Sequence, residues 1–346
     1  PKSLADTLSG QKAAVTEFAR VLKRQGTTQV DVVAIGSSMN AANIGKYGLT
    51  GVHLNVQEPP DFIQTSPVAI FVSQSGASSD AVPAFEALTS KRRNRPLIVT
   101  LTNTLDSPFA AGADIVLPTY ALKEEAIAAT GTMICATATF FHLGVELAGG
   151  KGRKQLMGLP DALDEYINGL PRVVDLGEIV SSLVDGNVGY IAFLGERIFR
   201  GVADEAALKV QEIADVITAS SGTRMFRHGY NTPLGARVQP VKGLGKALFI
   251  FPSGDAGEAK IIAKYKIQAE EAEYLLCQFS YVDSTNQLQM IHDEFCAIPK
   301  DVGQFGKAIL SVVASQVLAH DLAVAKGLEP GTSEILTKIV VDKPTA

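Results

Sequence analysis

The chain of 346 residues has no tryptophan, three cysteines, five histidines and a small net charge, and these scarcities exclude several classes of protein. A formal charge of -5 provides no basic field for nucleic acid, so an anionic ligand has to be bound locally by shaped donors. The histidines form no metal-ligand cluster, and neither a metal nor a cofactor is expected. The cysteines lie in apolar segments without C-x-x-C spacing, which indicates buried thiols in a reducing compartment: Cys135, Cys277 and Cys296.

Several common motifs are also missing. The chain contains neither a Walker A loop nor a G-x-G-x-x-G fingerprint, which disfavours nucleotide binding. No signal peptide opens the sequence, and we expect a cytoplasmic protein. One uncharged stretch, residues 126–145, has the length of a membrane span, but it is rich in Gly, Thr and Ala and contains His142. It therefore predicts a buried central helix, over residues 124–147, and no membrane association is expected.

Short β-branched runs alternate with helical periods along the first half, which is typical of βαβ units and a parallel sheet. The expected strands are residues 30–35, 52–56, 68–72, 97–101 and 115–117. A second series follows, with strands expected at residues 190–194, 248–251 and 274–279 and a helix at 202–217. Its segments resemble those of the first series as a diverged repeat. The prediction is an α/β fold of two lobes, each a mainly parallel sheet flanked by helices in three layers, with a first domain over 1–155, a helical connector over 156–187 and a second domain over 188–346.

Two strand-to-helix junctions in the first lobe are rich in serine and glycine. One reads Gly36-Ser37-Ser38, and the other begins Ser73-Gln74-Ser75-Gly76 and continues to Ser78. Such junctions lie at the carboxyl ends of parallel strands, where open α/β folds bind ligands and helix N-termini favour anions. Serine hydroxyls add donors without bulk, and a glycine allows the backbone to approach a phosphate. The alternative is that these serines only cap helices.

These two loops resemble those of the sugar isomerase (SIS) domain family, and residues 124–130 resemble the acidic turn before that family's central helix. The likeness spans nearly the whole chain and matches a double-SIS arrangement, as in the isomerase part of glucosamine-6-phosphate synthase. It implies that the phosphate ligands are Ser37, Ser38, Ser73, Gln74, Ser75 and Ser78. The corresponding loops of the second lobe carry Glu196 and Asp255, which would repel phosphate.

The second lobe offers a polar stripe instead. Glu205, Lys209 and Glu212 are spaced i, i+4 and i+7, on one side of an otherwise apolar helix. Aldose–ketose isomerisation needs a carboxylate base and a cation near the developing oxyanion, and this stripe contains both. The alternative is an exposed ion pair worth roughly 0.3–0.5 kcal/mol. The resemblance implies that Glu212 is the proton-shuttling base, that Lys209 stabilises the enediolate and that Glu205 supports them.

Two further residues take roles from the resemblance. His228 matches the family's ring-opening histidine, which a neighbouring subunit supplies, so a homodimer or higher homo-oligomer is expected. The family's motif Gly-Glu-Leu-Lys-His-Gly-Pro is replaced in this chain by Arg-Met-Phe-Arg-His-Gly-Tyr over residues 224–230. We therefore expect the local geometry to differ from that of the family. Lys338 resembles a lysine of the family's terminal segment that forms a Schiff base with the open ketose.

The sequence therefore predicts a phosphosugar isomerase or deaminase without a glutaminase domain. Its substrate would be a hexosamine 6-phosphate or a fructosamine 6-phosphate, converted through an enediol or enediolamine. The alternative is a non-catalytic sensor that binds a sugar phosphate, since SIS domains also occur in regulators. A sensor would bind fructose 6-phosphate without exchanging its C1 protons with solvent.

Overall fold

The computed structural model describes residues 1–173, 176–234, 245–282, 294–299 and 302–332. Within the described residues, contacts divide the chain into two units with a boundary between Asp161 and Ala162. The helices of the expected connector, α8 (Leu159–Val173) and α9 (Leu176–Asp185), fall mainly in unit 2, where α9 packs against the long helix α13 (Gly303–Ala325).

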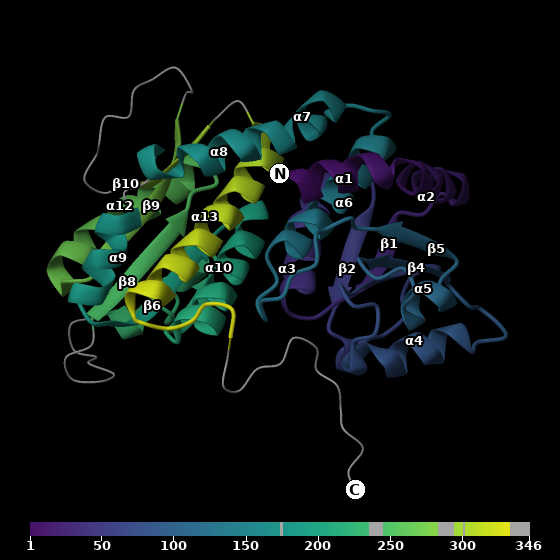
Figure 1. Cartoon of the computed structure of the whole chain (residues 1–346), viewed down its shortest axis with the longest axis horizontal. Coiled ribbons are helices and arrows are strands. Elements are labelled where there is room, and N and C mark those ends of the chain that lie inside the picture. Colours follow the sequence, from purple (N-terminus) through teal and green to yellow (C-terminus); the bar gives the residue numbers. More distant parts are fainter. Residues whose placement is uncertain (174–175, 235–244, 283–293, 300–301, 333–346) are drawn as a thin grey trace, which may run out of the picture. The chain divides into compact units, whose positions relative to one another are not determined.

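Unit 1 contains a five-stranded parallel sheet, coloured purple to blue in Figure 1. Its strands are β1 (Gln29–Val33), β2 (His53–Gln57), β3 (Val68–Val72), β4 (Leu97–Thr102) and β5 (Ile115–Pro118), in the order β2-β1-β3-β4-β5. Each strand overlaps one expected from the sequence. The buried, β-branched runs form strands because both faces of a parallel sheet are covered.

Helices cover both faces of this sheet. On one face lie α1 (Lys2–Gly10), α2 (Lys12–Gln25), α3 (Gly36–Gly45) and α6 (Gly131–Leu147), while α4 (Val82–Thr89) and α5 (Pro108–Gly112) cover the other. Short helices also span Lys46–Gly48, Pro59–Asp61 and Ser79–Ala81, and α7 covers Arg153–Met157. The core beneath α4 and α5 contains Phe71, Phe85 and Phe109, whose rings contact one another.

Unit 2 repeats this topology. Its parallel sheet has the order β10-β9-β8-β6-β7 and is built from β6 (Val188–Gly195), β7 (Ile217–Ser221), β8 (Gly245–Phe251), β9 (Leu275–Val282) and β10 (Glu294–Pro299). Numbered from its own first strand, the order is 2-1-3-4-5, the same as in unit 1. The identical strand order supports the diverged repeat read from the sequence.

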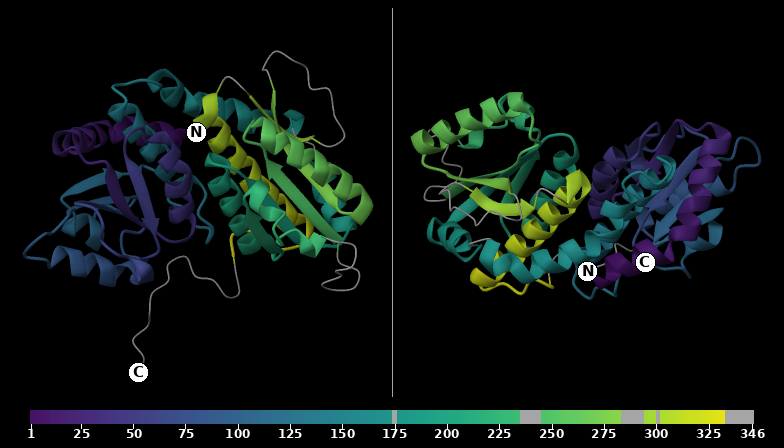
Figure 2. Two further views of the ribbon diagram at one scale, coloured as in Figure 1. Left: turned by 180° about the vertical axis from the view of Figure 1, so that it is seen from behind. Right: turned by 90° about the horizontal axis from the view of Figure 1, so that it is seen from above.

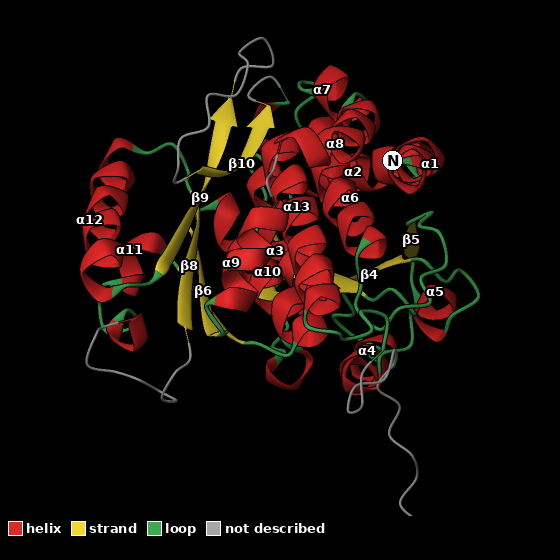
Figure 3. Cartoon of the chain, turned by 60° about the vertical axis from the view of Figure 1, so that its left-hand side comes forward, coloured by secondary structure: helices red, strands yellow, loops and turns green. Residues whose placement is uncertain are grey.

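Helices also flank the second sheet on both faces, as Figures 2 and 3 show. The helices α10 (Ile198–Ala214), α13 and α9 lie on one face, whereas α11 (Thr223–Phe226) and α12 (Ala256–Ala272) lie on the other; a short turn spans Thr232–Leu234. The predicted fold class, two three-layer α/β lobes, is confirmed. Strand β7 was not predicted, because residues up to 217 were assigned to the preceding helix.

Two helices are apolar enough to raise the question of a membrane. Helix α6, which contains most of the stretch 126–145, is buried from Thr132 to Val145, which confirms the expectation of a central helix. Among the described residues, α13 alone has the length and composition of a membrane span, and 72% of its apolar window is buried inside the protein. Such burial is typical of a core helix.

Candidate functional site

The serine loop of unit 1 follows β3 at the point where the sheet order reverses, between β1 and β3. Ser73 is buried, and its Oγ lies 2.8 Å from Ser78 Oγ and 3.4 Å from Ser75 Oγ. The amide of Gly76 donates to Ser73 Oγ at 3.1 Å. Three predicted phosphate ligands therefore gather in one small turn, with their hydroxyl groups converging.

The backbone of this turn is held in place from several sides. Gly76 has a left-handed φ of +62°, and a Cβ there would lie 2.0 Å from Ser107 Oγ. The carbonyl of Gln74 accepts hydrogen bonds from the hydroxyls of Thr102 and Thr104, each at 3.2 Å. The loop is thus preorganised before any ligand arrives, so binding causes a smaller loss of conformational entropy.

The remaining predicted ligands line one hollow of about 30 Å³ beside this loop. Its polar walls come from α3, from the serine loop, from β4, from the residue after β5, and from α6; they are Ser37, Ser38, Gln74, Thr102, Thr119 and Thr132. No charged side chain contributes to this lining. The threonines were not predicted, although their signal was present: each stands at the carboxyl end of a parallel strand or at the start of the central helix.

The alternative that the loop serines only cap helices is not supported by their hydrogen bonds. Helix α3 begins at Gly36 with Ile35 as its N-cap and has no side-chain capping hydrogen bond. Ser78 precedes the short helix Ser79–Ala81, again without a capping hydrogen bond from its side chain. The hydroxyl of Ser78 contacts Ser73 instead. The backbone amides at the start of a helix are the donors that bind anions in α/β folds.

Glu124 precedes the central helix α6, which forms one wall of this hollow. Its Oε1 accepts from Thr130 N at 2.9 Å and Thr130 Oγ1 at 2.8 Å, and its Oε2 accepts from Thr132 Oγ1 at 2.6 Å. Helix α6 has no capping side chain at its own N-cap, Thr130. The carboxylate therefore caps the helix from six residues upstream, and the helix starts at Gly131 rather than at 124 as expected.

We expect the variant Glu124→Gln to lose less stability in acid than the wild-type protein. Burial opposes ionisation, but hydrogen bonds from Thr132 and Thr130 outweigh it and hold the pKa of Glu124 below its ordinary value. The folded protein thus binds this proton more weakly than the unfolded chain, whose pKa is about 4.3. The stabilisation is present above about pH 4.3 and is lost as the pH falls through the folded-state pKa.

Urea denaturation between neutral pH and pH 3.5 measures this difference. Glu124→Ala should lose about 1–2 kcal/mol of unfolding free energy at pH 7, the usual cost of removing a helix cap. Glu125→Gln removes the neighbouring exposed carboxylate and controls for the change in net charge. If the unfolding free energies of Glu124→Gln and the wild type fell equally with decreasing pH, Glu124 would not be the source of this pH dependence.

The predicted stripe lies on α10 of unit 2. Glu205 and Lys209 are completely buried, with 0% and 1% of their side chains exposed, whereas 23% of Glu212 is exposed. Lys209 Nζ donates to Glu212 Oε2 and lies 3.7 Å from Glu205 Oε1. The alternative of an exposed surface pair is wrong, because two of the three side chains have no access to solvent. Burying a lysine between two carboxylates carries a desolvation penalty, which has to be offset by their attraction or retained for a function of the charged group.

His228 and Lys338 are the other residues predicted to act in catalysis. His228 follows α11, is exposed, and donates its backbone amide to Met225 O at 2.9 Å. Lys338 lies outside the described residues. Among the described residues, no group of three or more histidine, cysteine or acidic side chains is placed to hold a metal. Cys135 and Cys277 are buried free thiols as expected, and burial raises the pKa of Cys135 to about 11.

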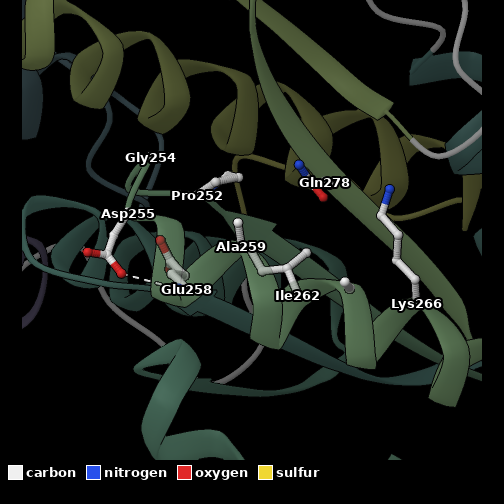
Figure 4. A pocket seen from close by; sticks show the side chains of 9 residues that line it. Pro252, Gly254, Asp255, Glu258, Ala259, Ile262, Lys266 and Gln278 are labelled. Atoms are coloured by element: carbon white, nitrogen blue, oxygen red, sulfur yellow. Dashed lines mark hydrogen bonds between the residues drawn. The ribbon is translucent and has the colours of Figure 1, made fainter.

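The second lobe has its own pocket of about 290 Å³, between the start of α12 and β9. Figure 4 shows Asp255 and Glu258 at one end, and Gln278 and Lys266 at the other. Glu258 is buried and accepts hydrogen bonds from the amide and hydroxyl of Ser253. A protein carboxylate thus occupies the donors of the loop that corresponds to the serine loop of unit 1, in line with the expectation that this lobe does not bind phosphate.

Curated proteins that resemble the chain are aminotransferases. The sequence is 25% identical over 358 residues to glutamine–fructose-6-phosphate aminotransferase (isomerizing) of Thermococcus kodakarensis, with 98% of this chain covered. It is 27% identical over 353 residues to the protein of the same name from Pyrococcus horikoshii. The chain spans about half of these relatives, 56% of the length of each. No protein-family model matches it.

Solved structures share the fold. A protein from Silicibacter pomeroyi with a provisional assignment as a phosphosugar isomerase matches with a TM-score of 0.77 at 22% identity, over 95% of this chain and 96% of that one. The C-terminal domain of glucosamine-fructose-6-phosphate aminotransferase from Francisella tularensis matches with a TM-score of 0.72 at 17% identity, over 96% and 98%. Glucosamine-6-phosphate deaminase from Thermotoga maritima matches at 0.65 and 20%, over 98% and 99%. These structural likenesses confirm the fold, and the sequence likeness to the aminotransferases agrees with the double-SIS resemblance.

Proposed function

We propose, from the double-SIS fold, that the protein is an enzyme that isomerises or deaminates a phosphorylated hexose or hexosamine through an enediol or enediolamine. The observation that carries this proposal is the buried Glu205–Lys209–Glu212 stripe. A protein that only binds a ligand has no need for a buried lysine paired with two carboxylates, whereas a proton transfer between C1 and C2 needs a base and a cation.

The serine loop supports a phosphorylated substrate. Hydroxyl and amide donors converge in this loop, and no charged side chain lines the hollow beside it. A phosphate bound in this way is held by hydrogen bonds and by the N-terminal ends of helices rather than by ion pairs. We therefore assign phosphate binding to Ser37, Ser38, Ser73, Gln74, Ser75 and Ser78.

The chemical roles follow from the nature of each group. Glu212, the most exposed of the stripe, takes the proton from C1 or C2 and returns it to the other carbon. Lys209 stabilises the negative charge on the enediolate oxygen, and Glu205 orients Lys209. His228 transfers a proton at the ring oxygen of a closed sugar, and we propose that a partner subunit supplies it in a homodimer. Lys338 remains a proposed Schiff-base lysine.

Proton exchange tests this proposal directly. Fructose 6-phosphate, glucosamine 6-phosphate, glucose 6-phosphate and a fructosyl-amino acid 6-phosphate are incubated with the protein in deuterium oxide, with and without ammonia. Proton NMR then follows the C1 and C2 positions. We expect deuterium to enter one of these sugars at C1 or C2. Binding of a sugar without any exchange would identify a sensor and overturn the enzymatic proposal.

A further inference from the structure

The arrangement of strands and loops proposed to bind phosphate in unit 1 recurs in unit 2. In unit 2, ion pairs occupy the space between the corresponding loops. The equivalent switch point lies between β6 and β8, and the loops after these strands carry Glu196 and Asp255. Arg224 donates from Nη2 to Asp255 Oδ1, and its Nη1 lies 3.8 Å from Glu196 Oε2. Its backbone amide also donates to Glu196 Oε1 at 2.7 Å. One arginine thus bridges the two loops of the second switch point.

Both carboxylates are mounted on fixed backbone. Asp255 is the N-cap of α12, and its Oδ1 accepts from the amide of Glu258 at 2.9 Å. This amide and the guanidinium of Arg224 hold the pKa of Asp255 below its usual value. Glu196 directly follows β6, and its carbonyl accepts from the amide of Phe199 in the first turn of α10 at 3.0 Å. The position of Arg224 is therefore defined by the ends of two sheet strands.

The segment that carries Arg224 leads to His228. Thr223 Oγ1 donates to the buried Glu258 at 2.7 Å, and Tyr265 Oη donates to Thr223 O at 2.8 Å. Phe226 is 1% exposed and packs edge-on against Tyr265. Two residues later, His228 is exposed. The chain is thus anchored up to Phe226, and the anchored part sets the direction from which the imidazole extends.

Arg224 stands where the resembled motif has its first glycine, and the glutamate and proline of that motif are replaced by Met225 and Tyr230. The ion-pair cluster is therefore a feature of this chain. We propose that Arg224, by bridging Glu196 and Asp255, is a positioning residue that holds the His228 segment, residues 223–229, in its working orientation. This inference rests on the proposed function, in which His228 opens the sugar ring.

A pair of substrates separates ring opening from the later proton transfer. Fructose 6-phosphate closes into a furanose through O5, whereas 5-deoxyfructose 6-phosphate lacks O5 and, with O6 esterified, stays open. Deuterium exchange at C1 is measured for both. We expect Arg224→Met to lower kcat for fructose 6-phosphate at least tenfold with KM within twofold, and to leave exchange of the open sugar within twofold of wild type. Arg224→Lys, which keeps one charge, should recover part of the loss.

The matched control is Arg95→Met in unit 1. Arg95 also pairs with an aspartate, Asp114, at a similar exposure of 32% and 34%, against 42% and 37% for Arg224 and Asp255. Removing one partly exposed ion pair costs too little to unfold a whole domain, so both variants should fold. The double variant Arg224→Met/His228→Ala should be no slower with fructose 6-phosphate than His228→Ala alone. An equal loss for both sugars, or a loss for neither, overturns the inference.

Hydrogen exchange keeps the inference testable if the wild-type protein turns over neither sugar, a result that would count against the proposed function itself. The amide of Arg224 and those that follow should exchange at least tenfold faster in Arg224→Met and in Glu196→Gln than in Arg95→Met. Unchanged protection of residues 224–228 in both variants would show that the ion pairs do not hold this segment.

Discussion

Glu212→Gln should lower turnover of the sugar that shows deuterium exchange by on the order of 10²–10⁴-fold, the usual contribution of general acid–base catalysis. Glutamine has the shape of glutamate and its carbonyl can still accept from Lys209, which donates to Glu212 in the wild-type protein. It cannot take up a proton at neutral pH, so only the proton transfer is lost. Isothermal titration calorimetry should show the dissociation constant of the sugar phosphate within about threefold of wild type, a difference below 1 kcal/mol.

The neighbouring position provides the control for this variant. Gln211 is exposed, and its Oε1 accepts from Thr218 Oγ1 at 3.0 Å. Gln211→Ala changes the same turn of α10 without touching the stripe and should keep wild-type turnover. If Glu212→Gln retains more than a tenth of the wild-type rate, the base is another group and the proposed roles on α10 have to be reassigned.

Gly76→Ala should weaken binding of the sugar phosphate at least about tenfold, which corresponds to 1.4 kcal/mol. Alanine at a φ of +62° costs roughly 1–2 kcal/mol of backbone strain, and its Cβ would lie 2.0 Å from Ser107 Oγ and 2.6 Å from Ser107 Cβ. Either the serine loop or the start of α5 has to move. Because Ser73 and Ser78 depend on this turn for their positions, the hydroxyl groups should no longer converge.

A second left-handed glycine separates backbone strain from the clash. Gly26 has a φ of +61°, and a Cβ there would meet nothing within 4 Å. Gly26→Ala should therefore lower stability without changing affinity for the sugar phosphate. The double variant Gly76→Ala/Ser107→Gly removes the clashing atoms and should recover part of the binding. Unchanged affinity in Gly76→Ala would mean that the serine loop does not bind the phosphate.

Much of the fold could be predicted from the sequence because the signals were local. Buried parallel strands such as Val68–Val72 are continuous apolar runs, which is why they could be found. The strand Ile217–Ser221 was missed, because Thr, Ala and Ser on an edge strand give no such run. The start of α6 was also placed too early, since its boundary depends on hydrogen bonds from Glu124 rather than on periodicity.

Only some residues of the candidate site could be predicted from the sequence. The serine loop and the stripe are contiguous patterns, and the structure places the serines together and buries Lys209 with Glu205. The threonines at the ends of β4 and β5 and the bridge made by Arg224 were not found. Their hydrogen-bond partners lie 16 to 31 residues away in the chain, and no spacing rule connects such positions. The acidic loops of unit 2 were recognised, but the arginine between them became evident only in three dimensions.

The central claim is that the switch point of unit 1 binds phosphate, whereas the equivalent crevice of unit 2 is filled by the protein's own carboxylates and arginine. A crystal structure with fructose 6-phosphate tests it most directly. The account predicts the phosphate on the hydroxyls and amides of residues 73–78, with Glu258 still bound to Ser253 in unit 2. A phosphate seated at the Ser253 loop, with the serine loop of unit 1 empty, would contradict it.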